Sequence, residues 1–335
     1  MPDDRGGEQQ SRHPGREEQN GHRGREEQNG HRGREEQDGL SRRALLRLGA
    51  GAAAGAAGAY AFGAMLDFGR STAVPGVTMT NVGAPLAPPP PPDPAPAAAP
   101  PTMVTGSFVS AARGGLNTNW AIARPPGQSH ALRPVIALHG KGGDAASVMA
   151  GGVEQGLAQL VDAGLPAFAV VSVDGGGSYW HKRASGEDSG AMVLSELLPL
   201  LGAQGLDTSR VAFLGWSMGG YGALLLGARL GAARTAAICA VSPALWMSYG
   251  ATAPGAFDSA QDWSDNTVFG LSQLASIPVR VDCGNSDPFY SATKQFIAQL
   301  PTPPSGGFSP GGHDGGFWSA QLPAELNWMA PLLVA

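Results

Sequence analysis

The stretch VAFLGWSMGGYGALLLGARL, residues 211–230, joins a strand to a helix through a turn that leaves almost no room for side chains. Residues 211–214 form an apolar, strand-like run, and residues 223–230 are rich in helix formers. Gly215, Gly219 and Gly220 surround Ser217, the nucleophilic side chain of the turn. The turn therefore places a single hydroxyl where a buried strand ends.

Residues 215–219, GWSMG, fit the G-x-S-x-G nucleophile elbow. In that motif a strained backbone lifts the serine hydroxyl above the end of a sheet, and the two glycines keep neighbouring chain from colliding. A glycine-rich turn with an incidental serine is the alternative. The rest of the chain must therefore supply a base, an acid and an oxyanion hole.

Residues 1–40 differ in composition from the rest of the chain, because they are polar and charged and almost free of apolar side chains. They contain the nine-residue repeat GREEQNGHR at 15–23 and again at 24–32. A repeat this short and polar cannot bury a core, so we expect a disordered region. We expect its histidines, His22 and His31, to be solvated rather than to bind metal.

Residues 41–66 resemble a twin-arginine export signal, because Arg42 and Arg43 precede a weakly hydrophobic Ala/Gly run with no acidic residue before Asp67. An internal Ala/Gly helix is the alternative. The run is also near the length that spans a bilayer, so a retained N-terminal membrane anchor stays open. Residues 67–101 follow as a Pro/Ala-rich linker. The signal predicts export, with the protein extracellular, in the cell wall or anchored at the membrane.

Residues 102–335 have a size suited to one α/β domain. Continuous apolar runs alternate with helical segments, which predicts a mostly parallel central sheet flanked by helices. The expected strands are 134–138, 167–173, 211–216, 235–241 and 279–283, with helices near 146–163 and 188–203. Two earlier segments, 106–110 and 117–123, predict an antiparallel hairpin at the sheet edge. The aromatic-rich segment 244–274 predicts a short cap over the site.

The net charge of −5 argues against nucleic acid as a partner. Cys239 and Cys283 lie in separate predicted strands. A disulfide is allowed outside the cytoplasm, and buried free thiols are the alternative.

Polar residues follow several of the predicted strands, at the edge where parallel sheets bind ligands. Ser217, Asp287 and His313 occur in the chain order that accompanies a nucleophile elbow. We expect Ser217 to be the nucleophile, His313 the base, and Asp287 the acid that orients His313 and stabilises its imidazolium form.

Other residues of the same types are weaker candidates for these roles. As the base, His130 is expected in a polar loop and His139 in the loop that forms the oxyanion hole. As the acid, Asp282 alternates within its strand, Asp314 adjoins the base itself, and Asp174 lies on the wrong strand.

The oxyanion hole needs two backbone N–H groups. One is expected from Met218, the residue after the nucleophile, and the other from Lys141 in the sharp loop LHGKGG. Aromatic side chains near the expected catalytic edge suit an acyl chain or a sugar ring. The expected substrate-binding residues are His181, Trp180, Trp216 and Trp318.

The motifs LHGKGG, DGG, GWSMGGYGAL, GNSDPF and GGHDGGFW together resemble the esterase D and antigen 85 branch of the α/β-hydrolases. The resemblance covers most of residues 130–335. It implies an α/β-hydrolase fold, and ester hydrolysis or acyl transfer without a metal or other cofactor. Two features depart from the antigen 85 mycolyltransferases: the acid is Asp287 rather than a glutamate, and the first loop contains His139.

The sequence as a whole predicts an exported serine esterase that acts through a Ser-His-Asp triad and an acyl-enzyme. One alternative is an acyltransferase that moves an acyl chain to a cell-envelope sugar. Another is a non-catalytic cell-wall binding protein on a hydrolase scaffold. The expected partner is an ester substrate, with an ester of a lipid or of a cell-envelope sugar as the more specific hypothesis.

Overall fold

The computed structural model describes residues 101–335. The repeat region predicted at 1–40 and the export signal or anchor predicted at 41–66 lie outside the described part of the chain. So do residues 67–100 of the linker predicted at 67–101. Within residues 101–335, none of the helices combines the length and the apolar character that crossing a membrane requires.

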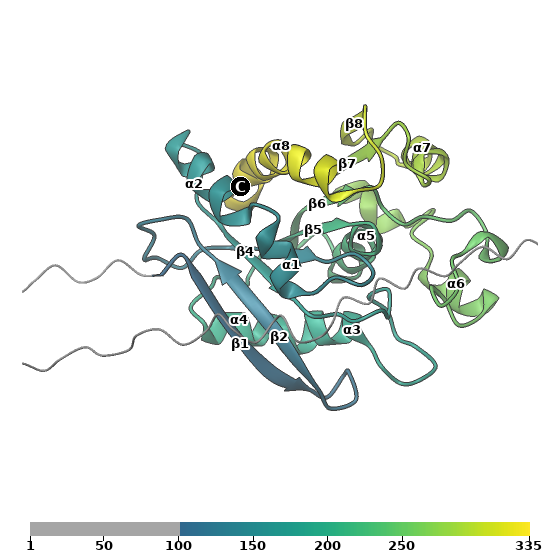
Figure 1. The fold of residues 1–335 in the computed structure, drawn as a ribbon, viewed down its shortest axis with the longest axis horizontal. Coiled ribbons are helices and arrows are strands. Elements are labelled where there is room, and N and C mark those ends of the chain that lie inside the picture. Colours follow the sequence, from purple (N-terminus) through teal and green to yellow (C-terminus); the bar gives the residue numbers. More distant parts are fainter. Residues whose placement is uncertain (1–100) are drawn as a thin grey trace, which may run out of the picture. The chain divides into compact units, whose positions relative to one another are not determined.

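An eight-stranded sheet with the order β1-β2-β4-β3-β5-β6-β7-β8 forms the centre of the described domain (Figure 1). Pairing is parallel from β4 through β8, whereas β1 with β2 and β2 with β4 are antiparallel. The hairpin therefore lies at one edge, as predicted. The strands are β1 Met103–Ser110, β2 Leu116–Ala123, β3 Pro134–Leu138, β4 Ala169–Val173, β5 Val211–Trp216, β6 Thr235–Val241, β7 Val279–Gly284 and β8 Ser305–Ser309.

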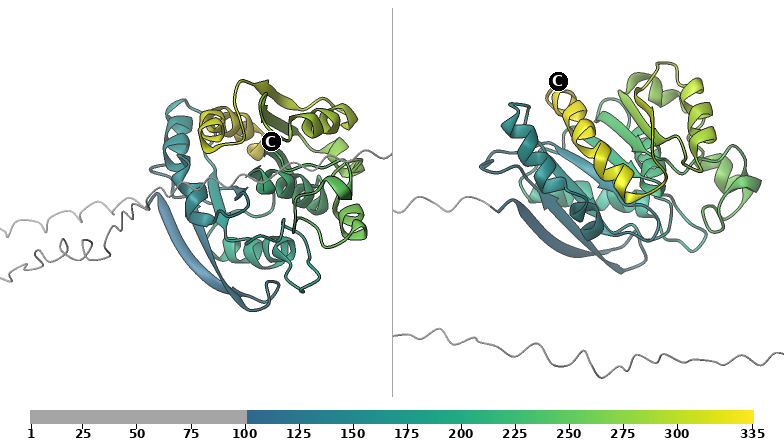
Figure 2. Two further views of the ribbon diagram at one scale, coloured as in Figure 1. Left: turned by 45° about the vertical axis from the view of Figure 1, so that its right-hand side comes forward. Right: turned by 45° about the horizontal axis from the view of Figure 1, so that its top comes forward.

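Helices cover both faces of this sheet (Figure 2). One face is covered by α1 Ala145–Ala150, α2 Val153–Asp162 and α8 Gly315–Val334. The other is covered by α5 Met218–Leu230, α7 Tyr290–Gln299 and a continuous helical stretch made of α3 Ser189–Ala191, the π-helical turn η1 Met192–Leu197 and α4 Leu198–Ala203. In the right-hand view of Figure 2, the yellow α8 lies beside the teal α2. The mostly parallel sheet with flanking helices that the sequence predicts is confirmed.

The core lies in two layers, because successive side chains of a strand point to opposite faces. Ile136 and Phe213 pack on the α5 side, whereas Val135 and Leu214 pack on the α8 side. All four are fully buried. Each such side chain contributes about 1.5–3 kcal/mol of hydrophobic stabilisation. This explains why the central strands read as unbroken apolar runs rather than as alternating ones.

The single helix expected near 146–163 is instead two helices, α1 and α2. The break falls at Gly152, whose φ of 100° is left-handed. A left-handed residue interrupts a right-handed helix, and glycine adopts that conformation without steric cost. The start of α1 is fixed by a capping box, in which Asp144 accepts from the Ser147 backbone N–H while the Ser147 hydroxyl accepts from the Asp144 N–H. The loop before α1 is therefore held at a defined position.

The segment 244–274 contains η2 Tyr249–Ala251, α6 Ala260–Asn266 and η3 Ser272–Ser276. Its aromatic side chains pack onto the core beside α5, where the ring of Phe257 lies 5.8 Å from that of Tyr221 and 6.1 Å from that of Trp246. The segment that the sequence predicts as a cap is thus packed against the core beside α5.

Candidate active site

The nucleophile turn connects β5 directly to α5. Ser217 has φ 57° and ψ −118°, a strained conformation for a residue with a side chain. A Cβ atom at Gly215 would lie 2.1 Å from the Gly219 carbonyl oxygen, and one at Gly219 would lie 1.9 Å from the Leu138 carbonyl oxygen. Only glycine fits at either position. Close contacts with neighbouring backbone atoms therefore require glycine at both outer positions of the motif.

Three residues from different strand ends meet at this turn. Ser217 follows β5, Asp287 follows β7, and His313 lies between β8 and α8. His313 Nε2 is 2.9 Å from Ser217 Oγ, and His313 Nδ1 is 2.8 Å from Asp287 Oδ2. An ionised carboxylate only accepts, so His313 donates from Nδ1 and Nε2 is left to accept the serine proton. The structure brings together the three residues that the sequence predicts.

The Asp287 side chain is fully buried, whereas 23% of the His313 side chain is exposed. Burial opposes the ionisation of Asp287, but hydrogen bonds from His313 and from the Phe289 backbone N–H hold the pKa of that carboxyl below its ordinary value. The Phe289 N–H lies 2.8 Å from Asp287 Oδ1. Asp287 is therefore a fixed anion beside a reachable imidazole.

The His313 ring lies between two aromatic rings. The Phe289 and Trp318 rings each have a centroid 5.3 Å from it, and Trp318 meets it edge-on at 89°. Asp314, next in the chain, does not face this ring but caps α8 by accepting from the Phe317 N–H at 3.0 Å. The packing orients the imidazole without competing for its nitrogens.

The two other acidic candidates have structural partners of their own. Asp174 Oδ1 accepts from the Ala145 N–H at 2.8 Å, so it joins the loop after β4 to α1. Asp282 points to the α8 side of the sheet and is paired with Arg280. Neither contacts His313.

The two backbone N–H groups expected in the oxyanion hole belong to Met218, the first residue of α5, and to Lys141 in the loop after β3. Neither N–H donates a hydrogen bond to another residue within 101–335. The N-terminal end of α5 also carries positive partial charge that favours an anion. Both donors therefore remain free for a substrate oxygen.

His139 fixes the loop that contains Lys141. Its Nε2 accepts from the Gly175 N–H at 2.8 Å, so its Nδ1 carries the proton and donates to the Gly140 carbonyl oxygen at 2.8 Å. Burial is the main cause that lowers the pKa of His139. The neutral ring joins the loops after β3 and β4, the supporting role expected of it.

A cavity of about 470 Å³ opens at Ser217 between α1 and α8. Trp216 and Trp318 line it, as expected of substrate-binding residues, and none of its lining residues comes from 244–274. The lining residues are His139, Gly140, Lys141, Gly142, Gly143, Ser147, Val148, Gly151, Trp216, Ser217, His313, Gly315, Trp318, Ser319 and Leu322.

Trp180 and His181 do not line this cavity, which corrects their predicted role in substrate contact. Trp180 is fully buried, with its ring 5.0 Å from that of His139. His181 is also fully buried, stacks on Phe257 at 5.1 Å, and approaches Asp262 Oδ2 at 3.3 Å. Both side chains turn inward and hold the loop after β4 against its neighbours.

Apart from Trp318, sequence reasoning did not single out the cavity residues that α8 contributes. Gly315, Trp318, Ser319 and Leu322 recur at intervals of three and four along the helix that starts just after His313. That spacing places them on one helix face. The signal was present in the periodicity, but the sequence did not show which face meets α1.

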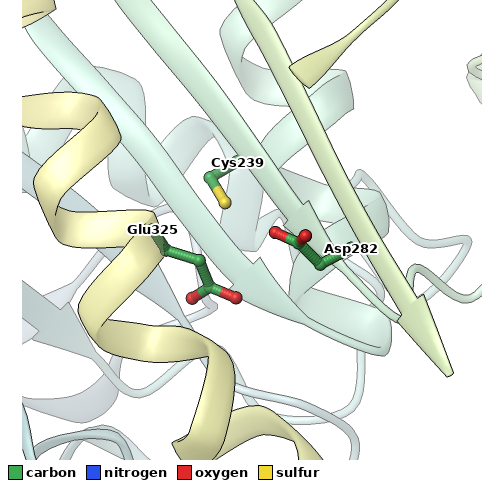
Figure 3. A group of neighbouring side chains, drawn as sticks. All are labelled: Cys239, Asp282 and Glu325. Carbon is green, nitrogen blue, oxygen red and sulfur yellow. The ribbon is translucent and has the colours of Figure 1, made fainter. Parts of the chain in front are cut away.

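One cluster within residues 101–335 has side chains that could hold a metal ion (Figure 3). Atoms of Cys239 on β6, Asp282 on β7 and Glu325 on α8 lie within 4.8 Å of one another, and all three residues are buried. Arg280 already donates to both Asp282 oxygens, at 2.6 and 3.1 Å. Burial raises the pKa of Glu325 well above its ordinary value, which favours the protonated carboxyl. Asp282 already has a partner in Arg280, and we assign the cluster no metal. Cys239 and Cys283 are both free thiols.

Comparison with known proteins identifies relatives of this domain. The model of the family described as "Putative esterase" matches residues 115–329. No curated protein sequence matches the chain.

Three solved structures have a similar fold. They are a ferulic acid esterase (21% identity, TM-score 0.60, covering 69% of this chain and 98% of that one), an S-formylglutathione hydrolase from Agrobacterium tumefaciens (19%, 0.55, 69% and 95%) and MPT51 from Mycobacterium tuberculosis (20%, 0.55, 67% and 97%). At these identities the structural similarity shows the fold. With the family match, it confirms the α/β-hydrolase fold and the esterase branch that the motifs indicate.

Proposed function

Since this chain belongs to the esterase family, we propose that it hydrolyses carboxylic esters through Ser217, His313 and Asp287. The observation that carries the proposal is the unbroken chain of hydrogen-bonding distances from Ser217 Oγ through His313 to Asp287. This arrangement has the order and contacts of a nucleophile, a base and an orienting acid.

In the proposed mechanism, Ser217 Oγ attacks the ester carbonyl while His313 Nε2 takes its proton. The carbonyl oxygen becomes an oxyanion that accepts from the Met218 and Lys141 N–H groups. His313 then returns the proton to the leaving alcohol, and an acyl-serine remains. Water, deprotonated by His313, attacks this acyl-enzyme and releases the acid. Asp287 stays ionised throughout and stabilises the imidazolium form of His313.

The cavity supports a substrate with an apolar group. Its walls include Trp216, Trp318, Val148 and Leu322, and the segment 244–274 does not close it. Aromatic walls suit an acyl chain or the face of a sugar ring. We therefore favour an ester carried by a lipid or by a cell-envelope sugar over a small soluble ester.

Export is part of the proposal, based on the resemblance of residues 41–66 to a twin-arginine signal. The protein would then meet envelope esters after leaving the cytoplasm. Replacing Arg42 and Arg43 with lysines should keep it inside the cell. Unchanged secretion of that variant would contradict the export proposal.

The reaction itself is tested by fluorophosphonate labelling and by hydrolysis of p-nitrophenyl esters of increasing acyl length. Ser217→Ala should lose the label and lower kcat by roughly four to six orders of magnitude. Ser319→Ala, which removes another hydroxyl of the same cavity, should keep the label. Labelling that persists in Ser217→Ala would contradict the proposed nucleophile, and a wild-type protein that takes no label would favour the binding-protein alternative.

The same series, repeated with a sugar acceptor, separates hydrolysis from acyl transfer. Free acid as the only product indicates an esterase. An acyl-sugar product indicates the acyltransferase, which uses the same acyl-enzyme with a different acceptor.

A further inference from the structure

Lys141 is the only Lys, Arg, Asp or Glu residue among those that line the cavity at Ser217. The other lining residues are glycines, serines, two histidines and residues with apolar side chains. The Lys141 backbone N–H is a proposed oxyanion donor, but that contact makes no use of the ammonium group at the end of the side chain. In a mostly apolar site, a few polar groups determine which ligand fits. The ammonium is therefore a candidate determinant of substrate charge.

The ammonium lies at the rim of the cavity. Lys141 Nζ donates to the Pro254 carbonyl oxygen at 3.3 Å and lies 5.9 Å from the centre of the Tyr179 ring. Neither Pro254 nor Tyr179 lines the cavity. The side chain thus extends from the loop after β3 to the segment 244–274, which lies outside the cavity lining.

The carbonyl group of Pro254 that receives the ammonium belongs to a loop that Arg183 fixes. Arg183 donates to the carbonyl oxygens of Gly255 and Ala256, both at 3.0 Å. It also pairs with Asp258 through two contacts, of 2.7 and 3.1 Å. A group that is held in place before the substrate arrives costs less conformational entropy on binding. The ammonium is therefore placed in advance for a ligand.

The charge of Lys141 is not compensated within residues 101–335, where it makes no ion pair. The acidic side chains of the neighbouring loops have other partners. Asp144 and Asp174 both accept from backbone N–H groups of α1. Asp258 pairs with Arg183. An ammonium has three N–H donors, and a single contact uses one of them, so the others remain for an anion of the substrate.

A row of aromatic rings leads from His313 to the ammonium outside the cavity. The His313 ring lies between Trp318, which lines the cavity, and Phe289, which does not. The Phe289 ring is 5.3 Å from that of Trp246, and the Trp246 ring is 5.8 Å from that of Tyr179, next to the ammonium. The base therefore has the cavity on one side and this aromatic row on the other.

The proposed reaction indicates which part of the ester meets the ammonium. His313 returns its proton to the leaving alcohol, so the alcohol oxygen lies beside the His313 ring. An acyl chain that fills the apolar cavity leaves the aromatic row as the place for the alcohol part. That row ends at the Lys141 ammonium.

We propose that Lys141 selects esters whose alcohol part carries an anionic group, which pairs with the ammonium while the acyl chain occupies the cavity. The inference rests on the proposed function and deepens it, since it narrows the ester to an anionic one. A phosphate of a lipid head group and a carboxylate of a sugar both supply such a charge. The ammonium binds the anion through the same charge-assisted hydrogen bonds in either case.

The test compares three butyrate esters that differ only at the para position of the leaving phenol. The para-carbamoylphenyl ester is neutral, whereas the para-carboxyphenyl and para-phosphonophenyl esters are anions. Lys141→Met should lower kcat/KM for the anionic esters relative to the neutral one by roughly fivefold, the upper range for an exposed ion pair, mainly through KM. Each ratio is taken within one variant and compared between variants. A change in the oxyanion hole and the intrinsic reactivity of each ester therefore cancel.

Two further variants separate a local contact from the net charge of the protein. Lys141→Arg keeps a cation at the rim and should keep most of the preference. Lys182→Met is the matched control, since Lys182 is also exposed but does not line the cavity. It should keep the wild-type ratio. Added salt should lower the preference of wild type and leave that of Lys141→Met unchanged, because salt screens exposed charges.

A loss of preference in Lys141→Met for both anionic esters supports the inference. A loss confined to one of them also supports it and identifies the group as carboxylate or phosphate. A Lys141→Met variant with the wild-type ratio would overturn the inference, and so would an equal loss in Lys182→Met. If wild type and Ser217→Ala hydrolysed all three esters equally, the proposed function itself would fail.

Discussion

The turns at the carboxyl ends of β4 and β5 are alike in composition, but their tryptophans lie in different surroundings. Both strands are fully buried, and each is followed by at least one non-glycine residue with positive φ. Trp216, the last residue of β5, and Ser217, which follows it, line the cavity. The loop after β4 turns Trp180 and His181 into the core, where each is fully buried.

Space left by glycines explains the inward direction of Trp180. A Cβ atom at Gly175 would lie 2.3 Å from its ring, and one at Gly222 would lie 2.4 Å from it. The indole fills the volume that these positions leave open. Position at the carboxyl end of a strand therefore brings a loop near the site, but packing decides whether its side chains reach substrate.

The largest expected effect comes from adding a single methyl group to the nucleophile turn. In Gly219→Ala the new Cβ would lie 1.9 Å from a backbone oxygen that no side-chain movement can relieve. The free energy of unfolding should fall by more than about 4 kcal/mol. Gly177→Ala is the control in the loop after β4, because nothing lies within 4 Å of its Cβ position; its change should stay within about 0.5 kcal/mol. Urea unfolding of both variants tests this, and equal stabilities would contradict it.

Trp180→Ala should act on stability rather than on substrate affinity. Removing a fully buried indole leaves a cavity and lowers the free energy of unfolding by about 3–5 kcal/mol. The KM of the folded variant should match that of wild type at low temperature. An increase in KM without a loss of stability would show that Trp180 does contact substrate.

Trp318→Ala should show the opposite pattern. Its side chain lines the cavity and packs edge-on against His313. KM for an apolar ester should rise roughly tenfold, equivalent to about 1.4 kcal/mol of lost contact. Trp318→Phe should recover most of this, because it keeps an aromatic wall. Steady-state kinetics with a short and a long acyl ester provide the measurement, and an unchanged KM for both would remove Trp318 from the substrate site.

The smallest effect concerns pH. Burial lowers the pKa of His181 from its ordinary value of 6.5. The unfolded chain therefore binds a proton at a pH where the folded protein does not, and the stabilisation present above pH 6.5 is lost as the pH falls. This histidine should contribute up to about 1.4 kcal/mol per pH unit to that loss.

His181→Gln should reduce the slope of unfolding free energy against pH below pH 6.5, as measured by urea titration. His130→Gln is the control, since His130 is exposed in the loop before β3. Equal slopes in the two variants would show that the buried ring of His181 does not contribute to the acid sensitivity.

Much of the site could be predicted because its signals are local. The elbow is a strand, a turn and a helix within one short stretch, and its glycines are fixed by contacts between backbone atoms. Asp287 and His313 follow from chain order and from their positions after predicted strands. The break between α1 and α2 was missed because it depends on the conformation of Gly152 alone.

The sequence by itself predicted the α/β class, the mostly parallel sheet and the three residues, Ser217, Asp287 and His313, that the structure brings together. These depend on periodicity and order, which are properties of the chain. The tertiary structure alone decided that the cavity lies between α1 and α8 and that Trp180 faces the core. These depend on the direction of side chains in loops and on contacts between distant segments, and a direction is fixed only when the neighbouring elements have filled the space around it.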